Sequence, residues 1–298
     1  MASVQQAATR PRPLSPGDKI AIASPAGAVD PALFAPAIAM LEQQGWRVEV
    51  MTHAMGRHGT YSGTYPERLE DMRRAILDPE VRAIMCGRGG YGAVHLLPEL
   101  DKLPIADDPK WLIGFSDISA LHGLWHAHGV ASIHAPMLRG LCYAAETGDH
   151  RQTDALFAML RGQEAPLPLE AHPLNRPGRA EGILLGGNLS VLSGLIGTKY
   201  DLLQPGAVLF LEDVNETIYK IERILWQLRL RGVLSSLNGL IIGQFTGAEP
   251  DANYVSIYDM IAEMVAEYDY PVAYNAPFGH KGLNFPFLLG APFSTVVP

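Results

Sequence analysis

Short apolar runs alternate with amphipathic stretches through the first half of the chain. The expected strands are 19–25, 47–52, 83–87, 111–115 and 131–136, and the expected helices are 31–45, 66–77 and 118–129. Strands that alternate with helices in this way favour parallel pairing, with the helices packed on the sheet. The pattern predicts an α/β fold with a doubly wound, mostly parallel sheet and helices on both faces.

The second half of the chain is less regular and begins after a proline-rich segment. Residues 166–177 read PLPLEAHPLNRP, and such a density of proline is typical of a linker, or of a long surface loop within one domain. Beyond it, 207–212 and 239–245 are expected strands, and 217–231 is the clearest amphipathic helix. We predict an N-terminal α/β domain over 1–165, a linker over 166–180 and a smaller C-terminal α/β domain over 181–298.

Composition narrows the functional classes. Hydrophobic residues make up 48% of the chain and charged residues 18%, which supports a sizeable core and excludes wholesale disorder. The net charge of −8 is a poor match to nucleic acid or to anionic lipid, so neither is an expected partner. Two cysteines exclude a disulfide scaffold. The first residues lack a secretory apolar segment, and no apolar run approaches a membrane span, so we expect a soluble, cytoplasmic protein.

A glycine-rich run follows the third expected strand. Gly87, Gly89 and Gly92 satisfy G-x-G-x-x-G, a spacing found where backbone approaches the pyrophosphate of a dinucleotide. The acidic residue that should follow some 20 positions later is replaced by Asp107 and Asp108 in a proline-flanked loop. Three interpretations stay open: dinucleotide binding without catalysis, a plain tight turn, or N–H groups that bind another anion, including a transient oxyanion.

A serine stands where the fourth expected strand turns into a helix. The run WLIGF leads directly into Ser116, so the hydroxyl is expected at the carboxyl edge of the sheet, as in a nucleophile elbow. The elbow motif is incomplete, because Ile118 stands where its second glycine would be. Ser116 as a simple helix N-cap is the alternative.

A nucleophilic serine needs a base and a carboxylate that orients the base. His280 lies in the glycine-rich loop PFGHKG, and Glu212 ends the strand VLFLE. Glu212, Asp213 and Asn215 could instead serve only the start of the next helix. His122 and His126 have the i, i+4 spacing of a zinc pair, but the glutamate of H-E-x-x-H is missing, and a helix face with solvated histidines is the alternative.

Taken together, these motifs resemble the LD-carboxypeptidases, serine peptidase family S66. The resemblance runs along nearly the whole chain and is carried by motifs in the family's order: SPAG at 24–27, RGGYG at 88–92, GFSD at 114–117, GGNL at 186–189, LED at 211–213 with Glu216, FGH at 278–280 and LLG at 288–290. It implies a doubly wound N-terminal domain and a smaller C-terminal domain with a β-rich core, with the active site between them and a homodimer as the assembly.

The resemblance also assigns roles to residues. It implies Ser116 as nucleophile, His280 as general base and acid, and Glu212 as the carboxylate that orients His280. The backbone N–H groups of Gly90 and Asp117 would form the oxyanion hole. Adjacent strand residues point to opposite faces, so only one of the two acids can reach His280. Asp213 is then expected to cap the turn into the helix that begins near Thr217.

The reaction that the resemblance implies is hydrolysis of the amide between an L-centre and a terminal D-alanine. The substrate would be a murein tetrapeptide or its disaccharide-linked form during peptidoglycan recycling, with no metal or organic cofactor. Arg88 and Asn188 are candidate substrate-binding residues, although Arg88 could equally be a solvated loop residue. A peptidase of the same family that confers immunity by cleaving a peptidyl-nucleotide antibiotic would keep the same triad.

Overall fold

The computed structural model describes residues 6–298, which form two compact units. The N-terminal unit contains Ala8–Pro166 and Phe285–Leu288. The C-terminal unit contains Leu167–Asn284 and Leu289–Pro298, together with residues 6 and 7. Neither unit is therefore a single uninterrupted stretch of chain.

A six-stranded sheet forms the centre of the N-terminal unit, with the strand order β10-β5-β4-β3-β1-β2. The strands are β1 (Lys19–Ala23), β2 (Arg47–Val50), β3 (Val81–Cys86), β4 (Trp111–Gly114), β5 (Ser132–His134) and β10 (Phe287–Leu289). The pairs from β2 through β5 are all parallel. Because the chain starts at β1 inside the sheet and builds outward in both directions, the doubly wound topology is confirmed.

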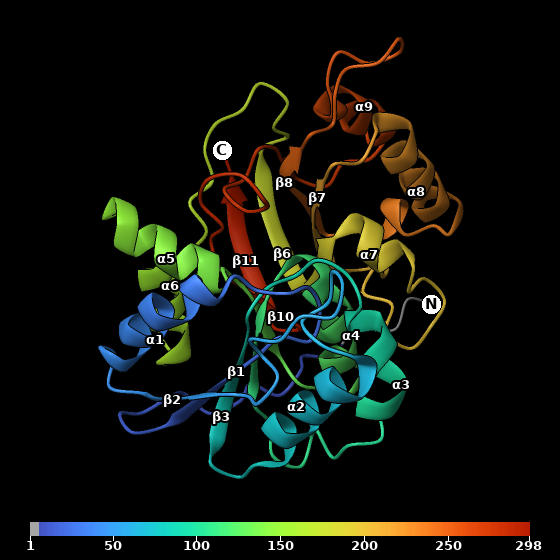
Figure 1. Cartoon of the computed structure of the whole chain (residues 1–298). Coiled ribbons are helices and arrows are strands. Elements are labelled where there is room, and N and C mark those ends of the chain that lie inside the picture. Colours follow the sequence, from blue (N-terminus) through green and yellow to red (C-terminus); the bar gives the residue numbers. More distant parts are fainter. Residues whose placement is uncertain (1–5) are drawn as a thin grey trace. The chain divides into compact units, whose positions relative to one another are not determined.

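Helices cover both faces of this sheet. They are α1 (Phe34–Glu42), α2 (Tyr65–Leu77), α3 (Leu97–Leu100), α4 (Ser119–Ala127), α5 (Leu138–Thr147) and α6 (Arg151–Leu160). Figure 1 shows α1, α5 and α6 grouped on one face and α2, α3 and α4 on the other. The sequence pattern had not indicated α5 or α6. The expected helix at 31–45 divides into a 3-10 turn, Pro31–Leu33, and α1.

A five-stranded sheet forms the centre of the C-terminal unit, with the order β11-β6-β7-β8-β9. Its strands are β6 (Gly178–Asn188), β7 (Val208–Val214), β8 (Gly239–Thr246), β9 (Val272–Ala273) and β11 (Pro292–Val297). Only β11 is antiparallel to its neighbour. The helices are α7 (Leu189–Ser193), α8 (Ile218–Leu230) and α9 (Ile257–Met264). The expected strands β7 and β8 and the expected helix α8 are confirmed.

The middle of the C-terminal sheet depends on one glycine. Gly186 has φ +139°, and a Cβ built there would lie 1.9 Å from the backbone oxygen of Phe210. Substitution by alanine must therefore displace β7 from β6. We expect Gly186→Ala to lower the free energy of unfolding by about 4 kcal/mol or more, or to prevent folding, as measured by urea denaturation and soluble yield.

Gly194→Ala is the matched control for that substitution. Gly194 ends α7 with φ −69°, and its added Cβ would meet only the Val191 oxygen at 3.5 Å, an ordinary contact. Its stability should stay within about 1 kcal/mol of the parent. Equal stability of the two variants would contradict this account of β6.

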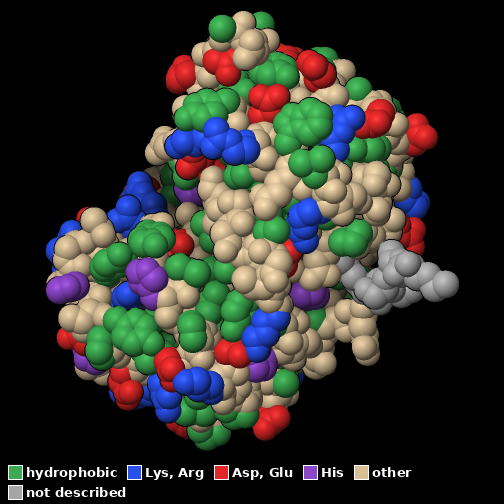
Figure 2. Space-filling model, turned by 90° about the vertical axis from the view of Figure 1, so that its right-hand side faces the viewer, with side chains coloured by type: hydrophobic (Ala, Val, Ile, Leu, Met, Phe, Trp, Pro, Cys, Tyr) green, Lys and Arg blue, Asp and Glu red, His purple; other side chains and the backbone are tan. Residues whose placement is uncertain are grey.

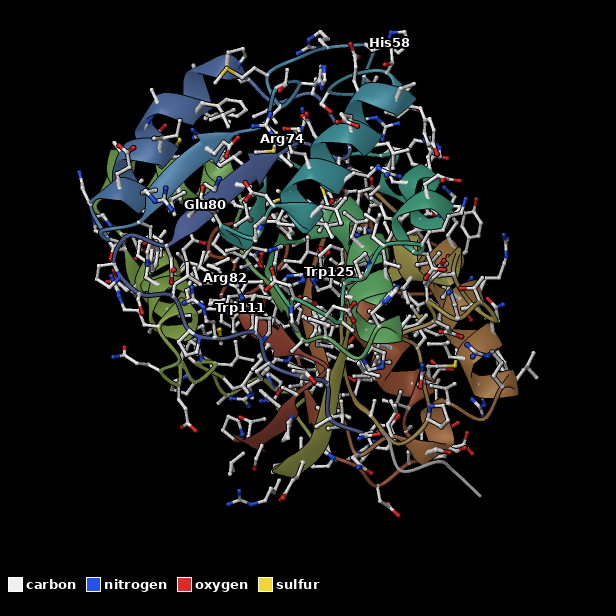
Figure 3. The ribbon with its side chains drawn as sticks, turned by 90° about the horizontal axis from the view of Figure 1, so that it is seen from below. His58, Arg74, Glu80, Arg82, Trp111 and Trp125 are labelled. Atoms are coloured by element: carbon white, nitrogen blue, oxygen red, sulfur yellow. The ribbon has the colours of Figure 1, made fainter. Side chains whose placement is uncertain are left out.

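Ion pairs and buried cations hold the amino edge of the N-terminal sheet. Lys110 is 2% exposed and donates to the carbonyls of Asp78 and Val81, each at 2.8 Å, and to the Asp108 carboxylate at 2.7 Å. Arg82 and Trp111, labelled in Figure 3, come from the neighbouring strands β3 and β4 at this edge, and Arg82 also binds Asp108, at 2.6 Å. Lys110 and Arg82 are thus bound to neighbouring backbone and carboxylate groups and stabilise the amino ends of β3 and β4.

One face of the protein carries mixed charge. On the face shown in Figure 2, Lys and Arg side chains are interspersed with Asp and Glu. Among the helices of residues 6–298, none has both the length and the apolar character needed to cross a membrane.

Candidate active site

Ser116 occupies a strained turn at the carboxyl end of β4. Phe115 is fully extended, Ser116 has φ +63°, and the 3-10 turn Ser116–Ile118 then leads into α4. A left-handed conformation costs a non-glycine residue about 1–3 kcal/mol and is retained mostly where function requires it. Phe115 precedes the 3-10 turn as its N-cap and Ile118 is the N-cap of α4, so the N-cap interpretation of Ser116 is wrong. The strand–turn–helix predicted around Ser116 is confirmed.

Bare backbone from the glycine-rich run packs against this serine. A Cβ at Gly89 would lie 2.7 Å from Ser116 Cβ and 2.8 Å from its Oγ. The Gly27 N–H donates to the Gly89 oxygen at 2.8 Å, which fixes the loop, and Gly90 has φ +111°. Gly89 is therefore needed for close approach to Ser116.

The same run does not lead into a helix suited to a dinucleotide. It continues into a 3-10 turn, Ala93–Leu96, and then into the four-residue α3. A pyrophosphate site of the dinucleotide type uses the N-terminus of a full helix directly after the glycines. The local structure thus favours the interpretation in which the loop serves Ser116.

Glu212 and His280 form a hydrogen-bonded pair in the C-terminal unit. Glu212 Oε2 lies 2.7 Å from His280 Nδ1, and Glu212, near the end of β7, is completely buried. Burial raises the pKa of Glu212, and the bond to His280 opposes that rise. When the Glu212 carboxylate is ionised it can only accept, so Nδ1 is then the ring nitrogen that donates to it. The bond to Glu212 fixes the orientation of the His280 ring.

A β-bulge holds the loop that carries His280. In the pairing of β7 with β8, Leu211 pairs with Ile242 and Asp213 with Phe245. Two residues of β8, Gly243 and Gln244, therefore lie opposite the single residue Glu212 of β7. A bulge leaves one residue outside the ladder and redirects it. The freed N–H of Gln244 donates to the Phe278 oxygen at 2.9 Å, and Gln244 Oε1 accepts from the Lys281 N–H at 3.1 Å. Gln244 thus fixes the chain on both sides of residue 280.

The Phe278 ring completes this support. A Cβ at Gly243 would lie 2.3 Å from the ring, so the ring occupies space that only glycine leaves open. The side chain of Asn284, which follows His280 in the chain, accepts at 3.1 Å from the N–H of Gly279, the residue before His280. We did not identify Gly243, Gln244 or Asn284 from the sequence. The available signal was a glycine inside an apolar strand, which marks a bulge or a close approach.

Asp213 has a different role from the one expected. Its carboxylate accepts from the Ser190 N–H at 2.8 Å, from Ser190 Oγ at 2.7 Å and from the Asn188 amide at 3.0 Å. It therefore holds the start of α7, and the expectation that it caps the turn into α8 is wrong. Sequence distance hid this role, because the start of α7 follows the strand that pairs with β7.

The two candidate substrate-binding residues already have protein partners. Asn188 is the N-cap of α7, and its oxygen accepts from the Val191 N–H at 3.1 Å while its amide donates to Asp213. The exposed Arg88 donates to the Ala28 oxygen at 3.0 Å. A substrate role for either residue stays a prediction.

The histidine pair on α4 does not form a metal site. His122 is fully buried, and its ring nitrogens lie 2.9 Å from the Gly114 oxygen and 2.8 Å from Ser132 Oγ. Burial lowers its pKa to about 4, so the ring is neutral, with Nε2 donating to the carbonyl. Across residues 6–298, no cluster of three or more His, Cys, Asp or Glu could hold a metal ion. His122 instead supports the end of β4, two residues before Ser116.

The N-terminal unit thus brings together Ser116, Asp117 and the backbone at Gly89 and Gly90. The C-terminal unit brings together Glu212 and His280. The first set has the features of an acyl-accepting serine beside N–H donors, and the second those of a general base with its orienting carboxylate.

Comparison with known proteins relates both units to the same protein family. Residues 20–135 match the model of the LD-carboxypeptidase N-terminal domain, and residues 181–294 match that of the LD-carboxypeptidase C-terminal domain. A murein tetrapeptide carboxypeptidase of Pseudomonas aeruginosa is 34% identical over 275 residues, covering 89% of each chain. The microcin C7 self-immunity protein MccF of Escherichia coli is 25% identical, over 92% of this chain and 90% of that protein.

A solved structure agrees with these sequence matches. The crystal structure of muramoyltetrapeptide carboxypeptidase from Oxalobacter formigenes is similar with a TM-score of 0.79 and 26% identity, covering 93% of this chain and 95% of that one.

Proposed function

The chain belongs to the LD-carboxypeptidase family, and we propose that it is a serine carboxypeptidase that releases the terminal D-alanine of murein tetrapeptides. The observation that carries the proposal is the buried Glu212–His280 pair, with its 2.7 Å bond, in a chain whose other unit presents Ser116 on a strained turn. Burying a carboxylate completely costs free energy, and such groups, paired with an imidazole, are found mainly at functional sites.

In the proposed reaction Ser116 Oγ attacks the carbonyl of the residue that precedes D-alanine. His280 Nε2 takes the serine proton and then delivers it to the leaving amine, so that D-alanine departs. A water molecule, deprotonated by His280, cleaves the acyl-enzyme and restores Ser116. Glu212 keeps the imidazole in the required tautomer and stabilises its protonated form.

The negative charge on the attacked carbonyl oxygen would rest on the backbone N–H groups of Gly90 and Asp117. Two features support this assignment: the contact of Gly89 with Ser116, and the position of Asp117 directly after the nucleophile in the same turn. Preorganised backbone donors of this kind are worth about 10²–10³ in turnover each.

The substrate of the proposed reaction has a free C-terminal carboxylate that a cation should bind. Arg88 is our candidate, because its exposed side chain lies next to the glycines that flank Ser116. Asn188 is the candidate in the C-terminal unit, because it is the direct register partner of Glu212 in the pairing of β6 with β7. Neither the murein tetrapeptide nor its disaccharide-linked form requires a metal or an organic cofactor for this chemistry. A role in peptidoglycan recycling, a cytoplasmic location and a homodimeric assembly complete the proposal.

Stereochemistry at the cleaved bond provides the test. We expect D-alanine to be released from a disaccharide-tetrapeptide but not from a pentapeptide that ends in D-Ala-D-Ala. The last bond of the pentapeptide joins two D-centres, so its carbonyl presents mirrored substituents to the same nucleophile and donors. Product analysis by mass spectrometry would measure both reactions. Similar rates on the two peptides would refute the LD specificity and leave the serine hydrolase intact.

A second substrate class deserves the same assay because of the similarity to the MccF self-immunity protein. A related peptidase that cleaves a peptidyl-nucleotide would use the same three residues. An aminoacyl-sulfamoyl adenylate, incubated under the same conditions, distinguishes the two functions. Cleavage of the adenylate with no release of D-alanine from the tetrapeptide would favour the immunity-type activity.

A further inference from the structure

One peptide group beside the nucleophile is held at both of its polar atoms. The Gly92 oxygen accepts from Arg68 Nη1 at 2.9 Å, and the Ala93 N–H donates to Asp117 Oδ2 at 2.9 Å. The two atoms belong to the same peptide unit, and both side chains come from elsewhere in the N-terminal unit. This peptide lies two residues after Gly90 in the glycine-rich run.

Arg68 is a buried cation that serves backbone carbonyls. It lies on α2, is 3% exposed, and forms no ion pair with a carboxylate anywhere in residues 6–298. Besides Gly92, it donates to the oxygens of Pro25 at 2.6 Å and Gly63 at 3.2 Å. Its guanidinium therefore joins three loops: the one after β1, the one before α2 and the one after β3.

The position of this guanidinium depends on its surroundings. Its carbon lies 4.8 Å from the centre of the Tyr61 ring, a cation–π contact. A Cβ on Gly92 would lie 3.0 Å from Arg68 Nη1 and 2.9 Å from Tyr61, so the last glycine of the run makes room for this arrangement. The α2 helix that carries Arg68 is fixed at its start by Glu67, which accepts from the Thr64 N–H at 2.7 Å.

Asp117 connects the same peptide to the nucleophile turn. Its side chain is 3% exposed, and its backbone directly follows Ser116. Burial raises the pKa of Asp117, and the bond from the Ala93 N–H and the charges of His95 and Arg68 oppose that rise. Asp117 thus provides one proposed oxyanion donor with its backbone N–H. Its side chain also holds the loop that provides the other proposed donor, the Gly90 N–H.

We propose that Arg68 and Asp117 are positioning residues that fix the distance between the two oxyanion donors by holding the Gly92–Ala93 peptide between them. This inference rests on the proposed function, since the donors are those assigned to Gly90 and Asp117. A donor displaced by even 1 Å loses much of its effect on a developing oxyanion. Binding of the substrate in its ground state does not depend on that distance.

Kinetics on purified variants test the proposal. We expect Asp117→Ala to lower kcat by about 100-fold, the scale of one lost oxyanion donor, with KM changed by less than about threefold. Asp117→Asn should retain most of the turnover, because its side-chain oxygen can still accept from the Ala93 N–H. Arg68→Met should lower kcat by about 10-fold or more, and Arg68→Lys should lie between it and the parent.

Lys110→Met is the matched control. It also removes a buried cation from two backbone carbonyls of the same unit, but at the amino edge of the sheet. We expect it to lower stability while leaving kcat unchanged. If Asp117→Ala or Arg68→Met keeps the parental kcat, or behaves as Lys110→Met does, the proposal is overturned. A change confined to KM would overturn it as well.

A second readout separates this proposal from the choice of substrate. A fluorophosphonate phosphonylates a reactive serine: Oγ bonds to phosphorus, fluoride leaves, and the base takes the serine proton. The polarised phosphoryl oxygen of the tetrahedral adduct uses the same donors. Labelling of Ser116, followed by mass spectrometry, should slow in the order given by kcat. If the parent is labelled but does not cleave the tetrapeptide, the proposed substrate fails and the labelling rates still decide the positioning role. If the folded parent is neither labelled nor active, both proposals fail.

Discussion

Replacing Ser116 by alanine is expected to lower D-alanine release by about 10⁴-fold or more. The reason is that no other group would form the acyl intermediate. The left-handed backbone conformation of Ser116 also predicts how the substitution affects stability. Alanine keeps the cost of φ +63°, so Ser116→Ala should unfold at nearly the same urea concentration as the parent.

Ser116→Gly is the informative companion. Glycine adopts a left-handed φ without strain, so this variant should be as inactive as Ser116→Ala but more stable by about 1 kcal/mol. Steady-state rates and urea denaturation of the three proteins measure both effects. Substantial activity in either variant would remove Ser116 as nucleophile, and a destabilised glycine variant would contradict the strain at the turn.

The second large effect is expected at Glu212. Glu212→Gln keeps the shape of the side chain but removes the charge that orients and stabilises protonated His280, and a serine triad loses about 10⁴-fold in turnover from such a change. The neighbouring Asp213→Asn should act differently. The Asp213 carboxylate accepts hydrogen bonds from donors at Asn188, Ser190 and Val214, so the NH₂ of an asparagine there must face a donor.

We therefore expect Asp213→Asn to lower the free energy of unfolding by about 1–3 kcal/mol while each folded molecule keeps most of its turnover. Active-site titration, which counts folded enzyme, separates the two effects. The reverse ranking, with turnover lost at Asp213 and kept at Glu212, would move the orienting role by one residue.

Periodicity was sufficient for the central elements of both units. β1, β3, β4 and β7 are completely or almost completely buried, and such strands form uninterrupted apolar runs that are easy to identify. The helix α8 was identified because its apolar positions share one face and Gly232 ends it. The long strand β6 was missed, because its glycines at 182, 186 and 187 interrupt the apolar pattern, and Gly186 is needed for close approach to β7.

The chemistry of the sites was less accessible to sequence reasoning than their residues. Ser116 was identifiable because a strand, a serine and a helix are contiguous. The role of Asp213 was not, because its partners Asn188 and Ser190 lie where β6 passes into α7, and only pairing of β6 with β7 brings them near. The support of His280 by a bulge at Gln244 was hidden for the same reason. The division of the chain into domains at 1–165, 166–180 and 181–298 stays a prediction, and limited proteolysis within 166–180 would test it.

The strand β10 has a consequence for how the protein must be made. It occupies the edge of the six-stranded sheet next to β5, and Phe285–Leu288 belongs to the N-terminal unit although it comes near the end of the chain. A ribosome therefore releases the first 166 residues long before this sheet can be completed. During that interval β5 is an open strand edge, the kind of surface through which nascent chains pair wrongly with one another. Truncation before residue 285 should leave the same edge exposed permanently, so the amino-terminal half expressed alone should aggregate even though it contains the nucleophile turn.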